Sequence, residues 1–349
     1  MEISLPDEHG RLQILQIHTS NLSRNNKLDK DIDLCHLAKE TKNYSGAEIE
    51  GLVRAAATTA MNRLVKVDGK ISVSNMDEFK VTKVDFEYGM LNDIKPSFGA
   101  NTEDFDTYIA QGVQSYGQPV ENILADGNLL IKQTRDGKNV SLVSVLFEGP
   151  KGSGKTALAA ELAVHSGFPF IKFCSPENMI GFSENAKCQA IKKVFEDAYK
   201  SELSCVVIDD IERLIEYVPI GPRFSNIVLQ TLMVLLNKKL KAGRKLLVLG
   251  TSSSREVLDQ MDLLSNFNTV IHVPAIQEHG HMRNVLQHNE YFTASELDEI
   301  DKLIKGKKLH VSVKKLLSLS EMAIQVSNEN QESRAKKFFY LLVEQNCLS

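Results

Sequence analysis

The sequence lacks three features that would each identify a class of protein: paired cysteines, a basic excess and a long apolar run. Its five cysteines are scattered without a CxxC pair, which argues against a disulfide framework or a zinc site and favours a reducing compartment. The formal net charge of −4 indicates no nucleic-acid partner and no anionic membrane surface. No apolar run reaches the roughly 18 residues of a membrane span, and no leader pattern opens the chain. We therefore expect a cytoplasmic protein, at most peripheral to membranes and without membrane insertion.

Length and composition predict a globular protein of about two domains. The 349 residues are 42% hydrophobic and 25% charged, as in ordinary folded proteins. Four segments follow one another: a mostly helical 1–95, a linker at 96–101, alternating strand and helix patterns over 102–275, and helical periodicity over 276–349. In the first segment, Ser45 and Glu48 predict a capping box that opens a helix ending near Val65.

The third segment contains five short apolar runs separated by helical or loop sequence. They are 143–147, 170–173, 205–208, 246–249 and 269–273. A parallel sheet covered by helices requires this alternation. We therefore predict an α/β nucleotide-binding core followed by a C-terminal helical lid, whose clearest helices are 314–326 and 333–345.

A phosphate-loop motif directly follows the first apolar run and directly precedes a helix predicted from Ala157 to Val164. Its residues are Gly149, Pro150, Lys151, Gly152, Ser153, Gly154, Lys155 and Thr156. The glycines let backbone N–H groups close around phosphate, Lys155 reaches the β- and γ-oxygens, and Thr156 offers its hydroxyl to Mg²⁺. The alternative is a glycine-rich turn with a chance Lys-Thr pair, but the strand–loop–helix context favours an ATP–Mg²⁺ site that extends to Ala157.

Two carboxylates, Asp209 and Asp210, end the third apolar run. Asp209 is the expected metal residue, since it follows a buried strand at a spacing typical of such sites. Active ATPases of this architecture usually have Glu at the next position to orient the attacking water, and Asp210 is one methylene shorter. We therefore expect slow hydrolysis with Asp210 as a catalytic residue. The alternative makes Asp210 only the N-cap of a helix from Ile211 to Tyr217.

Three further residues are candidates for contact with ATP bound to the same chain. Ser253 follows the fourth apolar run and is our candidate sensor of the γ-phosphate, with an ordinary serine-rich loop as the alternative. Tyr116 and Gly117 precede the first run and are candidates to pack on adenine. The alternative makes Tyr116 a core or lid-facing aromatic.

Cationic residues supply two more hypotheses. Arg244 and Lys245 precede a core strand, and Lys245 is our candidate to reach the γ-phosphate held by a neighbouring subunit. The alternative is a solvent-facing turn. Lys314 and Lys315 begin the predicted lid helix, so either could approach the nucleotide, and a solvated helix start is the alternative.

Longer blocks of the sequence resemble the second ATPase domain of the N-ethylmaleimide-sensitive factor family, the vesicle-fusing ATPases of the AAA+ class. These blocks are the phosphate loop, 174–184, Asp209-Asp210 and 217–226, while 2–7 and 44–49 resemble the helical lid of that family's first ATPase domain. The resemblance implies an AAA+ P-loop NTPase with a parallel sheet, flanking helices and a C-terminal lid. A separate small helical lid would precede it, belonging to a first AAA+ domain whose phosphate loop this sequence does not include.

The resemblance also implies an activity and partners. Members of this family are hexameric ATPases that, with SNAP-type adaptors, take SNARE complexes apart after membrane fusion. The first ATPase domain does most of the turnover there, and the second chiefly holds ATP and stabilises the hexamer. We therefore expect ATP and Mg²⁺ as cofactors, a homo-hexamer or a mixed ring with longer family chains, adaptors and SNAREs reached only through the full-length assembly, and no nucleic acid.

Two other functions remain open at this point. A stand-alone motor acting on another protein predicts vigorous turnover despite Asp210. It also needs to grip its substrate, and the position where ring-shaped unfoldases carry an aromatic residue is Met179 here, which predicts weak threading. A small-molecule kinase could use the same phosphate loop, but the sequence offers no apparent acceptor site.

Overall fold

A computed structural model describes residues 5–68, 70–73, 79–94, 96, 103–109, 112–137, 140–221, 223–330 and 333–348. The chain divides into two compact units, Met1–Ala100 and Asn101–Ser349. Of the predicted linker at 96–101, only Pro96 lies within the described residues.

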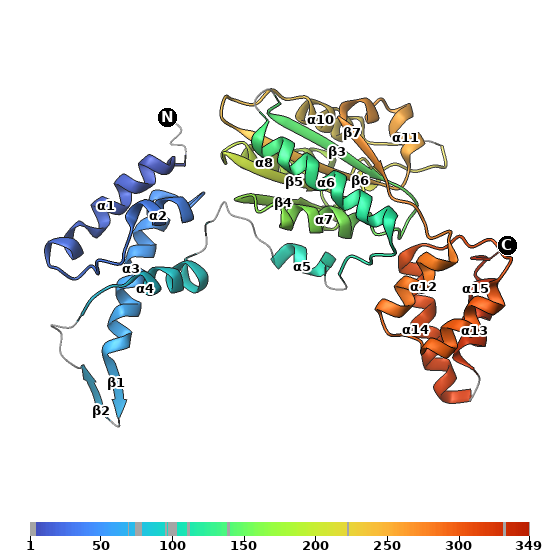
Figure 1. The fold of residues 1–349 in the computed structure, drawn as a ribbon. Coiled ribbons are helices and arrows are strands. Elements are labelled where there is room, and N and C mark those ends of the chain that lie inside the picture. Colours follow the sequence, from blue (N-terminus) through green and yellow to red (C-terminus); the bar gives the residue numbers. More distant parts are fainter. Residues whose placement is uncertain are drawn as a thin grey trace. The chain divides into compact units, whose positions relative to one another are not determined.

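The first unit is a small helical domain with a two-stranded antiparallel hairpin (Figure 1). Its elements are α1 (Glu8–Arg24), α2 (Leu34–Glu40), α3 (Gly46–Leu64), β1 (Val65–Asp68), β2 (Lys70–Val73), α4 (Lys83–Tyr88) and a π-helical turn over Gly89–Asp93. Buried apolar side chains such as Leu15, Leu52 and Phe86 join its helices into one core. The prediction that this segment is mostly helical is confirmed, but the hairpin was not predicted: Val65 and Val67, two β-branched residues after Leu64, lie in a strand that pairs with β2.

The capping box predicted at the start of α3 is confirmed. The Ser45 N–H donates to Glu48 Oε2 at 2.7 Å, and the Glu48 N–H donates to Ser45 Oγ at 3.4 Å. Two backbone donors that a helix start leaves unpaired are thereby satisfied.

The second unit is built around a five-stranded parallel sheet with the order β4-β5-β6-β3-β7. The strands are β3 (Leu142–Glu148), β4 (Phe170–Cys174), β5 (Leu203–Ile208), β6 (Lys245–Ser252) and β7 (Thr269–His272). Each of the five apolar runs is therefore a strand, as predicted. β3, β4, β5 and β6 are almost completely buried, since helices cover both faces of the sheet, whereas the edge strand β7 is only partly buried.

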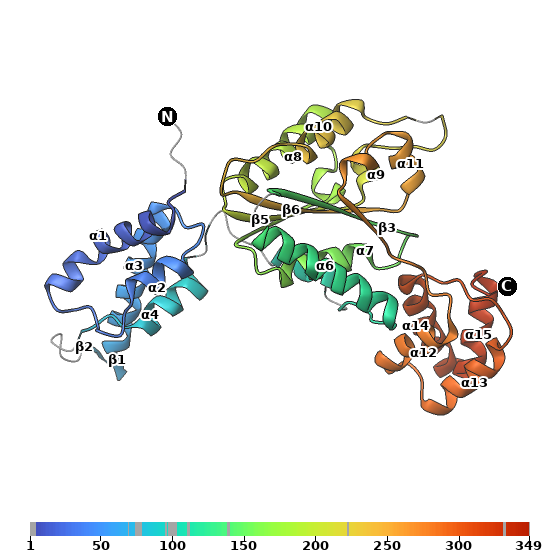
Figure 2. The same cartoon turned by 45° about the horizontal axis from the view of Figure 1, so that its top comes forward.

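Figure 2 shows α6 and α7 on one face of this sheet and α8, α9, α10 and α11 on the other. The helices of this core are α5 (Glu103–Ile109), α6 (Gln118–Asp136), α7 (Lys155–His165), α8 (Glu184–Ala198), α9 (Ile211–Leu214), α10 (Asn226–Leu236) and α11 (Arg255–Gln260), with short 3-10 turns η3 (Pro176–Met179) and η4 (Leu264–Asn266). An apolar core lies between β4, β5, β6 and the helices α8 and α10.

A helical lid follows β7. It consists of α12 (His279–His288), α13 (Ala294–Ile304), α14 (Val313–Asn330) and α15 (Arg334–Glu344), so both predicted lid helices are confirmed. The Lys314 N–H at the start of α14 donates to Gly152 O at 3.0 Å, which brings the lid against the phosphate loop. Across the described segments, every helix is too short or too polar to traverse a bilayer.

Candidate nucleotide-binding site

The candidate site lies where β3, β5 and β6 end. Because the three strands are parallel and in register, Glu148 pairs with Ser252 and Ile208 pairs with Gly250. The loops that follow them therefore leave the sheet at the same edge, which is where open α/β sheets bind ligands. This edge brings together the phosphate loop, Asp209-Asp210 and Ser253.

The backbone of the phosphate loop has a shape that only glycine allows at key points. Gly149 has φ 153°, and a Cβ there would lie 2.1 Å from Val273 O. Gly152 has φ 77° and lies against Ser312 and Lys314 of the lid. The loop then enters α7, whose first-turn N–H groups have no intrahelical partner and favour an anion.

The hydroxyl of Ser153 gives an independent indication of a ligand. Ser153 is 2% exposed, and its Oγ has no hydrogen-bond partner among the described residues. Buried hydroxyls are normally paired, and a phosphate oxygen would supply the missing partner. The residues present therefore fit a nucleotide phosphate.

Lys155 is buried beneath this loop, with 6% of its surface exposed. Its ammonium donates to Gly149 O at 3.0 Å and to Pro150 O at 2.8 Å. Burial lowers the pKa of Lys155, and the carboxylates of Glu212, Asp210, Asp209 and Glu148 oppose that shift. The surrounding carboxylates thus favour the cationic form that a phosphate requires.

Asp209 joins the phosphate loop to the end of β5. Its Oδ1 accepts hydrogen bonds from Thr156 Oγ1 and from Thr251 Oγ1, both at 2.7 Å. The Thr251 hydroxyl in turn accepts from the Asp210 N–H at 2.9 Å. Among the described residues there is no cluster of three or more His, Cys, Asp or Glu that could hold a metal. The oxygens of Thr156 and Asp209 fit Mg²⁺ that takes its remaining ligands from phosphate and water.

Asp210 stands at the N-cap position of α9, but its side chain makes no capping hydrogen bond. Its backbone is left-handed, with φ 43° and ψ 60°, and its Oδ2 lies 3.3 Å from Arg213 Nε. Burial, followed by Asp209 and Glu212, raises the pKa of Asp210. The alternative that Asp210 serves only as a helix cap is therefore wrong for its side chain. The helix is also shorter than predicted, since it ends at Leu214.

Ser253 follows the last residue of β6, and its N–H donates to Glu212 Oε1 at 2.8 Å. Glu212 is 7% exposed. Neither Glu212 nor Thr251 was predicted from the sequence. The available signals were a third acid in Asp209-Asp210-Ile211-Glu212 and a hydroxyl residue at the strand end, neither of which specifies a partner.

Comparison with known proteins identifies the family. The model of the ATPase family associated with various cellular activities (AAA) matches residues 145–275, the NSF AAA+ ATPase lid domain matches 275–345, and an AAA+ lid domain matches 31–80. A vesicle-fusing ATPase of Caenorhabditis elegans is 46% identical over 93% of this chain and 40% of its own length. The vesicular-fusion protein sec18 of Schizosaccharomyces pombe is 43% identical over 93% of this chain and 42% of its own length. The chain belongs to the vesicle-fusing ATPase family of AAA proteins.

The chain spans about two fifths of the length of these vesicle-fusing relatives. A vesicle-fusing ATPase of Arabidopsis thaliana gives the same picture, with 43% identity over 94% of this chain and 43% of the relative. Membership of the AAA family implies nucleotide binding, in agreement with the geometry of the phosphate loop.

Tyr116 does not offer adenine an open ring face. It is 2% exposed, its hydroxyl donates to Pro274 O at 3.0 Å, and its ring centroid lies 5.8 Å from that of His281 in the lid. The structure thus corresponds to the lid-facing alternative, because packing between core and lid covers the ring. Gly117, with φ 121°, lies against His281 and Asn284, and its contact with adenine stays a prediction.

The cationic candidates lie in different places. Lys245 begins β6, at the strand end opposite Ser252, and its Nζ donates to Arg135 O. Seven strand steps of about 3.3 Å separate it from that edge, so Lys245 cannot reach the phosphate loop of its own chain. Only the nucleotide of a neighbouring subunit remains as its predicted target. Lys315 donates to Gln345 O at 2.8 Å, whereas Lys314 adjoins the phosphate loop through its backbone.

In the loop after β4, the expectation that Met179 occupies a substrate-gripping position is wrong. Met179 is 4% exposed and belongs to the apolar core, because η3 turns its side chain inward. Two apolar residues that follow it face the solvent instead: Ile180 is 79% exposed and Phe182 is 44% exposed. In this member of the vesicle-fusing family, the position available for gripping a substrate is therefore not Met179.

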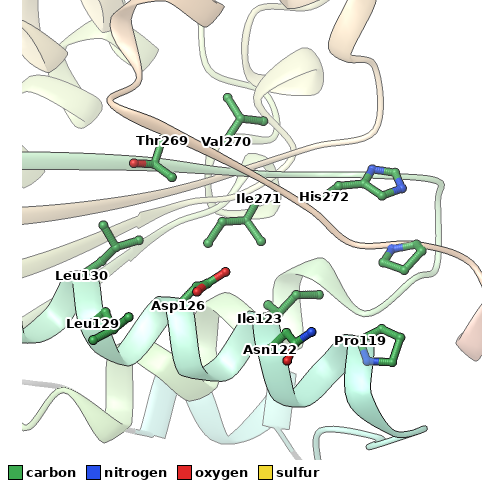
Figure 3. Close-up of a pocket in the computed structure, with 11 residues that line it drawn as sticks. Pro119, Asn122, Ile123, Asp126, Leu129, Leu130, Thr269, Val270, Ile271 and His272 are labelled. Carbon is green, nitrogen blue, oxygen red and sulfur yellow. The ribbon is translucent and has the colours of Figure 1, made fainter.

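A groove with a volume of about 530 Å³ lies between α6 and β7 (Figure 3). It is lined by Pro119, Asn122, Ile123, Asp126, Leu129, Leu130, Thr269, Val270, Ile271, His272 and Pro274. None of the predicted nucleotide-site residues is among them. The groove touches the site only indirectly, since His272 Nδ1 lies 2.8 Å from Oε1 of Glu148, the residue before the phosphate loop.

Proposed function

We propose that this chain is the ATP-binding module of a vesicle-fusing ATPase, with slow hydrolysis of its own. The observation that carries the proposal is the contact between Thr156 of the phosphate loop and Asp209 at the end of β5. P-loop NTPases hold Mg²⁺ with a hydroxyl and a carboxylate from these two segments. The unpaired hydroxyl of Ser153 and the glycine-shaped loop support phosphate binding at the same point.

Each residue has a proposed role. The backbone of residues 149–157 surrounds the phosphates, and Lys155 contacts the β- and γ-oxygens. Thr156 and Asp209 would hold Mg²⁺, which neutralises charge on the phosphates when bound. Asp210 orients the water that attacks the γ-phosphorus as the bond to the β–γ bridging oxygen breaks, and Ser253 contacts the γ-phosphate. The short side chain of Asp210 and its ion pair with Arg213 favour slow turnover.

The proposal extends to assembly. ATP would stabilise a homo-hexamer, or a mixed ring with longer family chains, because it binds the assembled state in preference to the separate chains. Lys245 would contact the nucleotide of a neighbouring subunit. SNAP-type adaptors and SNARE complexes would be engaged only through the full-length assembly, and the proposed location is the cytoplasm. The family membership of the chain supports this reading.

The mass of the purified chain tests this proposal. Light scattering or sedimentation is measured with ATP–Mg²⁺ and without nucleotide, while phosphate release is followed in parallel. A hexamer that requires ATP and hydrolyses it slowly supports the proposal. A monomer with fast turnover contradicts it.

The stand-alone motor has one observation in its favour. The exposed Ile180 and Phe182 give the loop after β4 an apolar surface that could grip a polypeptide. A motor of this kind predicts that an unfolded protein stimulates phosphate release and that Ile180→Ser abolishes the stimulation. No stimulation in the wild-type chain would contradict it.

A further inference from the structure

Glu212 links two segments of the chain that flank the proposed γ-phosphate position. It lies on α9, which begins directly after Asp210, and its Oε1 accepts the hydrogen bond of the Ser253 N–H at 2.8 Å. Ser253 lies just beyond β6, so the ladder of the sheet does not fix its position. The Glu212 carboxylate therefore holds a residue that the strand itself leaves free.

A second contact fixes the end of β6 itself. Thr251 bonds to Asp209 Oδ1 at 2.7 Å and to the Asp210 N–H at 2.9 Å. Thr251 and Glu212 thus attach successive parts of the same segment to the end of β5. Thr251 holds the strand, and Glu212 holds the residue after it.

The other oxygen of Glu212 shows that packing alone does not explain this side chain. Glu212 is 7% exposed, and its Oε2 is buried with no hydrogen-bond partner among the described residues. An unpaired buried polar group lowers stability, and a charged one lowers it more. Ile211 and Leu214 of the same helix are apolar and 1% exposed, so an apolar side chain at position 212 would avoid that cost.

The charges around Glu212 come from four elements. Asp209 and Asp210 follow β5, Glu148 ends β3, Lys155 begins α7, and Arg213 adjoins Glu212 on α9. Burial lowers the pKa of Lys155, and Glu212 is the carboxylate that opposes this shift most strongly. The carboxylate thus lies within electrostatic reach of the group that contacts the γ-phosphate in the proposed site.

We propose that Glu212 is a positioning residue for ATP hydrolysis, holding the Ser253 backbone, and with it the Ser253 hydroxyl, beside the γ-phosphate. The inference rests on the proposed function of the phosphate loop. Its effect falls on the rate of the chemical step, because the geometry of groups at the reacting centre determines kcat while contacts along the rest of the nucleotide determine affinity.

Two variants of Glu212 separate positioning from structure. Glu212→Ala removes the acceptor for the Ser253 N–H, whereas Glu212→Gln keeps an acceptor oxygen of the same reach. Glu196→Ala, on the exposed side of α8, is the matched control. ATP affinity, the kcat and KM of phosphate release, and the thermal unfolding midpoint are measured for each, with wild type and Lys155→Ala alongside.

Glu212→Ala is expected to lower kcat by about 10- to 100-fold, since small misplacements at a reacting centre have effects of this size. ATP affinity is expected to stay within about 3-fold of wild type, because the phosphate loop is intact. Glu212→Gln restores most of the rate, and Glu196→Ala leaves it unchanged. Neither Glu212 variant lowers the unfolding midpoint in proportion to the rate, because Glu212→Ala also removes the unpaired buried oxygen and Glu212→Gln removes the buried charge.

Three results would overturn the inference. The first is a kcat of Glu212→Ala equal to that of wild type. The second is a fall in kcat in Glu212→Gln as large as that in Glu212→Ala. The third is a fall in kcat that is fully accounted for by weaker ATP binding or by a lower unfolding midpoint. Failure of the proposed function has a different signature. In that case wild type does not bind ATP, or Lys155→Ala hydrolyses it equally fast, and both proposals fall together.

Discussion

Thr156 and Asp209 lie 53 residues apart in the chain, and their side chains meet at 2.7 Å. The hydroxyl hydrogen points to the carboxylate, so the lone pairs of Thr156 Oγ1 remain available to a cation. A magnesium ion bound there would leave this hydrogen bond intact. The contact would thereby prepare the geometry of the proposed metal site before any ligand arrives.

Replacing Thr156 tests this metal site directly. Thr156→Val keeps the shape of the side chain but removes the hydroxyl, so affinity for ATP in the presence of Mg²⁺ is expected to fall about 10-fold or more, by analogy with other lost metal-site contacts. Affinity measured in EDTA changes much less. Thr156→Ser, which keeps the hydroxyl, is the control. Calorimetry measures the ATP affinity of both variants with Mg²⁺ and in EDTA. An equal loss of affinity under the two conditions in Thr156→Val would contradict the role of Thr156 in holding the metal.

Lys155→Ala is expected to abolish ATP binding and any nucleotide-dependent assembly. The ammonium is the one cationic side chain within the buried part of the described phosphate loop, and its loss leaves phosphate charge uncompensated. Lys192→Ala, at an exposed position of α8 outside the site, is the control and keeps its affinity. Titration with a fluorescent ATP analogue compares the two. Wild-type affinity in Lys155→Ala would refute the site.

Asp210→Glu is expected to raise the rate of phosphate release, because the longer side chain reaches the position of the attacking water. Asp210→Asn is expected to lower it, since an amide cannot accept a proton from water. Steady-state phosphate release at saturating ATP gives both rates. An unchanged or lower rate in Asp210→Glu would argue that Asp210 does not contact the water.

The raised pKa of Asp210 has a consequence for stability. A folded state that binds this proton more tightly than the unfolded chain is penalised once the pH rises and Asp210 ionises. Asp210→Asn is therefore expected to raise the unfolding midpoint at pH 7 to 8. The gain should disappear as the pH falls below about 4, the ordinary pKa of aspartate.

Thermal scans between pH 4 and 8 measure this difference. Asp126→Asn, at an exposed position of α6, serves as the control. A difference that stays constant over the whole pH range would contradict the prediction.

Gly149→Ala is expected to lower the free energy of unfolding by about 2 kcal/mol or more, from overpacking and backbone strain together. Its Cβ would lie 2.1 Å from the backbone oxygen of Val273. Gly280→Ala, on α12 with nothing within 4 Å of the new Cβ, is the control. It should be neutral or stabilising by up to about 1 kcal/mol, because alanine favours the helix. Urea unfolding compares the two variants.

Local sequence patterns were sufficient to predict much of the fold. The five strands and the two lid helices follow from apolar runs and helical periodicity, which are properties of neighbouring residues. The β-hairpin of Val65–Asp68 and Lys70–Val73 was missed because two four-residue segments carry little local signal, and each becomes a strand only by pairing with the other. The phosphate loop could be found because its glycines, lysine and threonine are contiguous.

The sequence by itself determined which residues form the phosphate loop, that Asp209 directly follows a buried strand, and that a helical lid follows the core. Only the tertiary structure decided that Tyr116 is covered by the lid, that Met179 is buried while Ile180 is exposed, and that Thr251 and Glu212 contact the candidate site residues Asp209 and Ser253. The reason is physical. A local pattern specifies the conformation of a segment, but burial and hydrogen-bond partners depend on which distant segments pack against it.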